Sequence, residues 1–244
     1  MKIKIAYLYY DLMNLNGEHA NVKALIRHFE NANVDTDVDY LTIGDKYDLT
    51  KYDVVYMGQG SMESMTLAIK DMFKHKDNIK KAIEKGVYFF LTGTSLELFG
   101  KSITNLKGEK RECLKLFPYY TKYIDIEDYS EECKFRVVED AVAESDFIDQ
   151  KIIGFHNRAG LIYDNNSPIF KMTKGTGNNL DTKDEGYNYK NVYATYMIGP
   201  LFIRNPYLTD YFVKKIILEK DPEFEVKITR NTPEYKAYKK HFDN

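Results

Sequence analysis

Apolar runs of strand length alternate with helical patterns through the first half of the chain. The strand patterns cover residues 2–10, 34–41, 52–57 and 87–92. After the first of them, Val22, Leu25, Ile26 and Phe29 recur at the 3.6-residue spacing of a helix with one apolar face. Buried strands separated by helices predict a doubly wound, mostly parallel sheet of the α/β class.

Ligands of such sheets bind in the loops beyond the carboxyl ends of the strands. Loops of this kind follow three of the predicted strands, at 10–21, 58–61 and 93–95, and we expect them to converge on one crevice. Residues 61–73 and 74–85 have helical patterns, and Gly86 stands in a C-cap position. We interpret the lysines of the second helix as a solvated face whose apolar stripe is turned inward.

The second half of the chain has a different pattern. Residues 113–127, 133–144 and 151–164 alternate in the manner of exposed antiparallel strands, which we expect in addition to the parallel sheet. A glycine- and asparagine-rich loop, a strand and an amphipathic helix follow at 174–187, 191–200 and 207–220. We expect one domain over residues 1–244, in which the residues after about 222 form a polar C-terminal tail.

Composition excludes several classes of protein. Lysine, arginine, aspartate and glutamate are interleaved and sum to a net charge of −2, so no nucleic-acid-binding face is expected. No apolar run approaches the length of a membrane span and no signal peptide is evident, which predicts a cytoplasmic protein without membrane insertion. The two cysteines, Cys113 and Cys133, form no Cys-x-x-Cys pair, and the five histidines lack metal-ligand spacing. Neither a disulfide, a metal nor another cofactor is expected.

Residues 91–100 predict a strand that turns sharply at Gly93-Thr94 and continues as an amphipathic helix ending at Gly100. Enzymes use this corner to raise a serine or cysteine nucleophile above a sheet, but here it carries glycine and threonine. The spacing Thr94-x-x-Glu97 is that of a capping box, in which the threonine caps the helix and the glutamate returns the hydrogen bond.

Five segments in order resemble the class I (triad-type) glutamine amidotransferases. They are an Asn followed by a Gly-acid-x-x-Asn run within 9–21, the glycine-bearing strand and turn at 54–61, and residues 174–179, 184–191 and 194–206. The resemblance is to the branch that contains the cobyric acid synthase glutaminase domain and the small subunit of lipid II isoglutaminyl synthase. It covers nearly the whole chain, and it implies a flavodoxin-like fold and a Mur-ligase-like or other ATP-dependent amidating partner subunit.

The chain departs from this family at the residues that perform catalysis. Aligning the family's Cys-Gly-Gly-x-Gln-x-x-Gly motif on Gly100 places Gly93 at the cysteine, Thr94 and Ser95 at the two glycines, and Glu97 at the glutamine. The family's catalytic histidine, in a His-Gly-Pro turn, corresponds to Ile198. Amide hydrolysis requires an ionisable nucleophile and a base within hydrogen-bond reach, and neither glycine nor isoleucine supplies one. The resemblance therefore implies that catalytic residues are absent.

Other residues remain candidates for binding. The turn formed by Gly58, Gln59, Gly60 and Ser61 can present backbone N–H groups to an oxyanion, although Gln59 replaces a usual glycine and so alters or partly fills the hole. Arg136 matches an arginine that holds substrate in the lipid II branch, or it is an exposed strand residue.

The remaining nucleophiles and histidines have simpler interpretations. Thr94 and Ser95, the nearest hydroxyls to the corner, are further candidates for ligand binding, but as nucleophiles they need an adjacent base. We interpret Cys113 and Cys133 as small buried hydrophobic residues, His19 as a surface-loop residue that could reach the crevice rim, and His156 as structurally hydrogen-bonded.

Three functions are consistent with these residues. The leading hypothesis is a catalytically defective amidotransferase-like subunit that serves as scaffold or regulator of an amidating partner in cell-wall precursor modification. The second is a sensor that binds a small carboxylate or amino-acid amide through Arg136 and residues 58–61. The third is an active enzyme that uses Thr94, Ser95 or His19.

Overall fold

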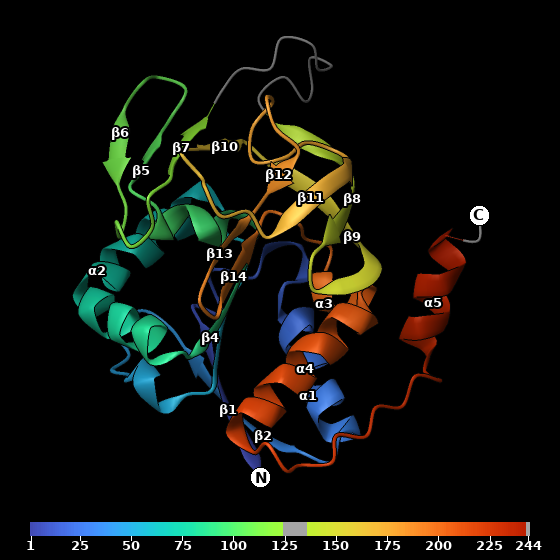
Figure 1. Ribbon diagram of the computed structural model, residues 1–244. Coiled ribbons are helices and arrows are strands. Elements are labelled where there is room, and N and C mark those ends of the chain that lie inside the picture. The colour runs from blue at the N-terminus through green and yellow to red at the C-terminus, as the bar shows by residue number, and fades with distance from the viewer. Residues whose placement is uncertain (124–135, 243–244) are drawn as a thin grey trace.

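A six-stranded sheet forms the centre of the protein (Figure 1), for which a computed structural model describes residues 1–123 and 136–242. The strand order is β13-β14-β4-β3-β1-β2, and all neighbours are parallel except β13 and β14. Its strands are β1 (Lys2–Leu8), β2 (Asp35–Leu41), β3 (Val54–Met57), β4 (Tyr88–Thr92), β13 (Tyr187–Tyr189) and β14 (Val192–Thr195). The predicted doubly wound, mostly parallel sheet is confirmed.

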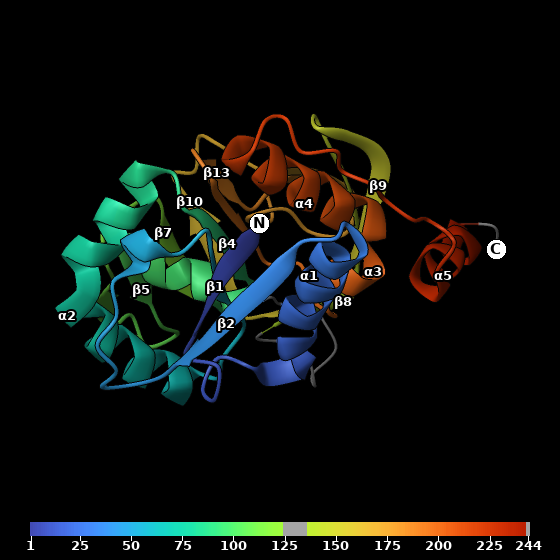
Figure 2. The ribbon, with the colours of Figure 1, turned by 90° about the horizontal axis from the view of Figure 1, so that it is seen from below.

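Helices cover both faces of this sheet (Figure 2). Helices α1 (His19–Asn31) and α4 (Pro206–Lys220) lie on one face and α2 (Met62–Lys85) on the other. Because successive strand residues point to opposite faces, Ile3 and Ile5 of β1 pack with the α1 and α4 side chains, whereas Ala6 packs with α2. Both faces of β3, β4 and β14 are thus buried, which explains their nearly continuous apolar sequences, whereas the edge strand β2 keeps exposed positions.

Helix α2 is one helix of 24 residues, not the two that the sequence patterns suggested. It begins after Ser61, whose side chain accepts a hydrogen bond from the backbone N–H of Ser64 at 3.1 Å. It ends at Gly86, which has a left-handed φ of 92° and confirms the predicted C-cap. The residues between the two apolar patterns simply continue the helix, since no glycine or proline interrupts them.

Two smaller sheets lie beyond the carboxyl ends of the central strands (Figure 1). One has the order β10-β7-β5-β6 and the other β12-β11-β8-β9. Their strands are β5 (Ser102–Thr104), β6 (Lys110–Glu112), β7 (Tyr120–Tyr123), β8 (Val137–Ser145), β9 (Ile148–Arg158), β10 (Gly160–Tyr163), β11 (Phe170–Lys174) and β12 (Asp184–Glu185). The predicted antiparallel strands are present, in the pairs β8–β9 and β7–β10. Residues 151–164 do not pair with each other, because β9 and β10 lie in different sheets. Cys113 is a buried free thiol, and Cys133 lies outside the described residues.

The residues after 222 differ from the polar tail that the sequence suggested. Residues 233–242 form helix α5 (Pro233–Phe242), which packs against α3 (Leu201–Arg204) and α4. Tyr235 and Tyr238 are buried, and the Tyr235 hydroxyl donates to Asp210 of α4 at 2.7 Å. The lysines around the two tyrosines dominate the composition of this segment and obscured its i, i+3 aromatic pair.

Among the described residues, no helix is long and apolar enough to cross a membrane. In the same part of the chain, no group of three histidine, cysteine, aspartate or glutamate side chains is arranged to hold a metal ion.

The hydrogen bond from Tyr235 of α5 to Asp210 of α4 predicts that loss of the Tyr235 hydroxyl lowers stability. Replacing Tyr235 with phenylalanine removes a hydrogen bond to a buried carboxylate, and we expect the free energy of unfolding to fall by about 2 kcal/mol. Tyr207→Phe is the control, because the Tyr207 ring packs on Tyr235 at 5.2 Å while no hydrogen bond joins its hydroxyl to the described residues. Urea titration of both variants measures the difference, and equal losses would contradict this role of the hydroxyl.

Candidate functional site: a closed corner at the carboxyl edge of the sheet

The three loops predicted to converge do meet at the carboxyl edge of the central sheet. The backbone N–H of Leu15, in the loop after β1, donates to the carbonyl oxygen of Gln59 after β3 at 2.9 Å. Gly60 in turn donates to the Thr94 hydroxyl after β4 at 3.2 Å. A fourth segment, residues 196–200, follows β14 at the same edge. The predicted convergence of the three loops is confirmed.

The corner after β4 has the backbone of a nucleophile elbow. Gly93 follows the last strand residue directly and has φ = +62°, a left-handed conformation that L-residues adopt only at a cost in energy. The segment that follows is the 3₁₀ helix η3 (Gly93–Phe99) rather than the expected amphipathic helix, and all seven residues are buried. The small sheets cover the side of η3 that the sequence pattern assigned to solvent.

The side chain of Gln59 fills the space above Gly93. A Cβ atom built on Gly93 would lie 2.5 Å from the Gln59 Cβ and in contact with the Gln59 Oε1. Gln59 is 1% exposed, and its Nε2 donates to the carbonyl oxygen of Asn157 at 3.4 Å. The Oε1 has no hydrogen-bond partner among the described residues. Any side chain at position 93 would therefore have to displace Gln59.

The hydroxyls of Thr94 and Ser95 are held by backbone groups. Thr94 donates to the carbonyl oxygen of Gly60 at 3.0 Å, and Ser95 donates to those of Met57 at 3.0 Å and Thr92 at 2.9 Å. The predicted capping box is wrong, because Thr94 bridges to the neighbouring loop and Glu97 turns away from the backbone. Tertiary packing, not helix capping, determines both orientations.

Ile198 occupies the turn after β14 as a structural residue. Its backbone exchanges two hydrogen bonds of 3.0 Å with Phe155 of β9, and its side chain is buried. Gly199 follows with φ = +100°, and Pro200 precedes α3. The turn thus ties the central sheet to the second small sheet, and its apolar side chain offers no group for proton transfer.

Glu18 was not identified from the sequence. Its buried side chain connects the loop after β1 to strands β3 and β4. Its Oε2 accepts hydrogen bonds from the hydroxyls of Tyr56, at 2.6 Å, and Thr92. Asn21 donates to the same oxygen at 3.4 Å, and its own Oδ1 accepts from the backbone N–H of Phe202. Burial raises the pKa of Glu18, although these hydrogen bonds act in the opposite direction. The Gly-acid-x-x-Asn run was the available signal, since it contains both residues.

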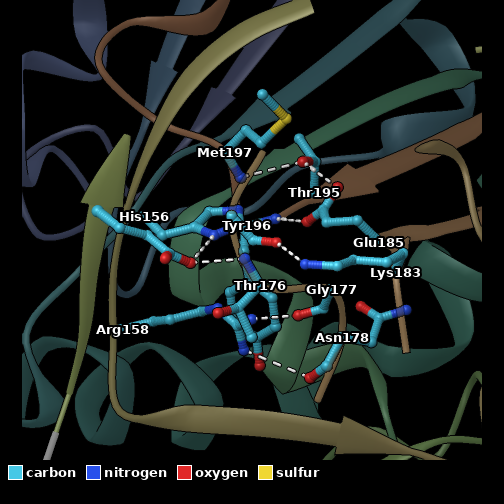
Figure 3. A network of polar contacts seen from close by, with 12 residues as sticks. His156, Arg158, Thr176, Gly177, Asn178, Lys183, Glu185, Thr195, Tyr196 and Met197 are labelled. Atoms are coloured by element: carbon cyan, nitrogen blue, oxygen red, sulfur yellow. Dashed lines mark hydrogen bonds and ion pairs between the residues drawn. The ribbon is translucent and has the colours of Figure 1, made fainter. Parts of the chain in front are cut away.

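A second buried network fixes the segment that leads to Ile198 (Figure 3). The Tyr196 hydroxyl donates to Glu97 at 3.0 Å, and its backbone N–H donates to Glu185 at 2.7 Å. The Arg158 guanidinium lies 4.1 Å from the centre of the Tyr196 ring. Burial raises the pKa of Glu97 and of Glu185 to about 7, against opposing hydrogen bonds from tyrosine and threonine. Tyr196 is therefore held at its backbone, its hydroxyl and its ring face.

The structure places the other candidate side chains at different distances from the corner. Arg136 is exposed and donates through Nε to Asn157 Oδ1 at 2.9 Å, so it joins the Gln59 side chain through that asparagine. His19 is exposed at the start of α1. His156 is buried in β9 without a hydrogen bond among the described residues and lies 3.6 Å from Glu139, so the predicted structural hydrogen bonding is wrong.

The raised pKa values of Glu97 and Glu185 predict a pH dependence. Their folded-state pKa of about 7 exceeds the ordinary value of 4.5, so the folded protein binds more protons between these pH values. Each carboxyl contributes its full share to the free energy of unfolding below pH 4.5, and this contribution is lost as the pH rises through 7. The loss is up to roughly 3 kcal/mol for each group. His156, whose pKa burial lowers to about 4, acts oppositely between pH 4 and 6.5.

Comparing the wild type with the Glu97→Gln/Glu185→Gln variant separates the pH effect of the two carboxyls from that of His156, because both proteins contain His156. We expect urea unfolding between pH 5 and 8 to show a smaller loss of stability in the variant. Parallel pH profiles would show that these groups ionise with ordinary pKa values.

Close packing at the corner predicts the effect of a methyl group. Gly93→Ala should lower the free energy of unfolding by roughly 3 kcal/mol, from a left-handed backbone and an overpacked contact with Gln59. Gly44→Ala is the control, because Gly44 has φ = +88° and nothing within 4 Å of an added Cβ, and we expect a loss of about 1 kcal/mol. Adding Gln59→Gly to Gly93→Ala should recover roughly 2 kcal/mol relative to additivity. If urea titrations show that the two substitutions have additive effects on the free energy of unfolding, the Gln59 side chain does not pack against position 93.

Comparisons with known proteins establish the family of the chain. The CobB/CobQ-like glutamine amidotransferase domain matches residues 4–206. The chain is 30% identical over 236 residues to the lipid II isoglutaminyl synthase (glutamine-hydrolyzing) subunit GatD of Staphylococcus aureus (strain N315), covering 97% of this chain and 93% of the relative. The subunit of the same name from Streptococcus pneumoniae (strain ATCC BAA-255 / R6) is 27% identical, over 90% of this chain and 82% of its own.

A crystal structure of a glutamine amidotransferase superposes with a TM-score of 0.52 at 13% identity, and covers 88% of this chain and 97% of its own. That likeness concerns the fold alone. The sequence matches reach further, because they span the loops that form the corner as well as the sheet. The chain belongs to the CobB/CobQ-like glutamine amidotransferase domain family.

Proposed function

We propose that this chain is an amidotransferase-fold subunit that does not hydrolyse glutamine. The observation that carries the proposal is the Gln59 side chain, which occupies the space where a nucleophile at position 93 would stand. A glutamine hydrolase needs a thiol or hydroxyl at this elbow and a base beside it. Here glycine and the buried Ile198 stand at the two positions that the family motifs assign to these groups.

The neighbouring hydroxyls do not replace the missing nucleophile. Thr94 and Ser95 are buried, and each donates its proton to a backbone carbonyl oxygen, which cannot serve as the base for hydroxyl attack. A buried hydroxyl in this state is also closed to substrate. This arrangement favours a non-catalytic subunit over an enzyme with an unconventional nucleophile.

In a non-catalytic subunit the preserved fold must serve binding, and we propose a Mur-ligase-like or other ATP-dependent amidating chain as its partner. Both curated relatives are named as subunits of a lipid II isoglutaminyl synthase, so a partner chain is part of their description. This chain would act as scaffold or regulator of amidation in cell-wall precursor modification, with free ammonium as the nitrogen source. The alternative, a sensor for an amino-acid amide, is less favoured because Gln59 closes the crevice that such a ligand would enter.

Ammonia release from glutamine tests the proposal directly. We expect the native complex, purified through this chain, to release no ammonia from glutamine in a coupled glutamate dehydrogenase assay, and to amidate its acceptor when ammonium chloride is supplied. Ammonia release that disappears in the Thr94→Ala/Ser95→Ala variant would overturn the non-catalytic function. A complex that contains no ATP-dependent ligase chain would overturn the partner.

A further inference from the structure

A lysine-lined groove runs along the side of the protein, between α2 and the first small sheet. Two adjoining hollows of about 390 and 630 Å³ share the wall formed by residues 115–118, and we name them together the lysine groove. The lining lysines come from α2, β5–β6 and the shared wall: Lys76, Lys80, Lys101, Lys110 and Lys115. Figure 1 shows α2 and β6 on the same side of the molecule.

The charges of this groove are not balanced by its own acidic residues. Two glutamates line it, and each is already paired: Glu112 with Lys115 at 2.6 Å, and Glu84 with Lys190, which lies just outside, at 2.5 Å. The four other lysines of the groove have no ion pair among the described residues. In a chain whose net charge is −2, this groove carries a local excess of positive charge.

The floor of the groove is apolar and aromatic. Phe117 packs against Tyr187 with ring centres 4.7 Å apart, and Tyr189 lies 6.0 Å from Phe117. Leu116 lines both hollows, and Tyr189 remains 39% exposed. Lysines around an apolar floor complement an acidic segment that also carries an apolar side chain. The lysines attract the acidic residues of the segment, and the floor buries its apolar side chain.

Lys115 lies on the wall shared by the two hollows. Its backbone has φ = +56°, a left-handed conformation in which glycine is favoured over every residue with a Cβ. Five other described non-glycine residues also have a positive φ, so this conformation alone does not indicate a binding role. It does make Lys115 a position where glycine can replace the side chain without straining the backbone.

We propose that the lysine groove binds an acidic, apolar-anchored segment of a partner protein. The inference rests on the proposed function, since the partner is the amidating chain with which this subunit assembles. The competing explanation is that the lysines protect two open sheet edges, β6 and β13, against pairing with other chains. Glutamates protect an edge equally well, so reversing the charge distinguishes the two explanations.

The first experiment places a photo-crosslinker in the groove of the full-length chain in its native cell. Leu116→p-benzoylphenylalanine should crosslink a segment of the ligase chain in which aspartate and glutamate outnumber lysine and arginine. Ile43→p-benzoylphenylalanine is the control on another surface, where Ile43 is 42% exposed, and should not yield that peptide. Crosslinks to a segment without excess acid, or to lipid or nucleotide in place of protein, overturn the proposal.

The second experiment measures the affinity of the purified ligase chain for variants of this subunit. Lys76→Glu/Lys110→Glu should weaken binding by roughly tenfold and reduce its salt dependence. The matched control Lys46→Glu/Lys214→Glu reverses two exposed lysines outside the groove that have no ion pair among the described residues, and should bind as wild type does. Equal affinities of the two variants for the ligase chain overturn the proposed binding role of the groove. They leave the proposed non-catalytic function intact.

Lys115→Gly separates binding from folding. Because glycine relieves the left-handed backbone, the urea midpoint of unfolding should not fall, while affinity for the ligase chain should. A variant that loses stability and keeps its affinity shows that Lys115 serves the fold, and overturns its role in the groove.

Discussion

The buried carboxyl group of Glu18 is the interaction on which the geometry of the corner depends. Hydroxyls from two different strands, Tyr56 of β3 and Thr92 of β4, converge on one of its oxygens, and Asn21 extends the network to the backbone before α4. Burying a carboxyl is costly unless donors surround it, and here the donors come from separate strand ends. The hydrogen bonds to that one oxygen therefore fix the ends of the strands relative to one another, and with them the turns that begin there.

Glycine turns allow those strand ends to approach more closely than side chains would permit. A Cβ on Gly58 would lie 2.5 Å from the Glu18 Cβ, and one on Gly93 would lie equally close to the Gln59 Cβ. Interiors packed at this density contain no spare volume for a substrate. In this chain the Gln59 side chain uses the room that a side chain at position 93 would need. A cysteine introduced there alone would therefore overpack the core.

The sequence predicted the sheet well, because parallel strands buried on both faces are nearly continuous apolar runs, as in residues 87–92. It predicted the meeting of the loops for the same reason, since strand order and direction place their ends together. It failed where a tertiary contact replaces a local one. Thr94 and Glu97 have capping-box spacing, yet Gly60 and Tyr196 offer them partners from distant segments. The Gly-acid-x-x-Asn run includes Glu18 but did not reveal its partners, because Tyr56 and Thr92 come from distant strands. The docking of Tyr235 was missed because the surrounding lysines obscured its aromatic pair with Tyr238.

The corner is rigid, whereas the excess positive charge lies on the outer surface, in the lysine groove. This separation favours a role in assembly with a partner chain. The clamp on Tyr196 fixes the backbone of a turn whose side chain, Ile198, has no acid–base chemistry. Such precision serves a subunit that must present a fixed surface to another chain, because ordering a flexible surface on binding would reduce affinity. The lysine groove is built on the same rigid elements, with its floor at Phe117 packed on Phe99 of η3. Through that contact the closed corner supports an outer face, which gives the tightly packed amidotransferase fold a physical role in the proposed assembly.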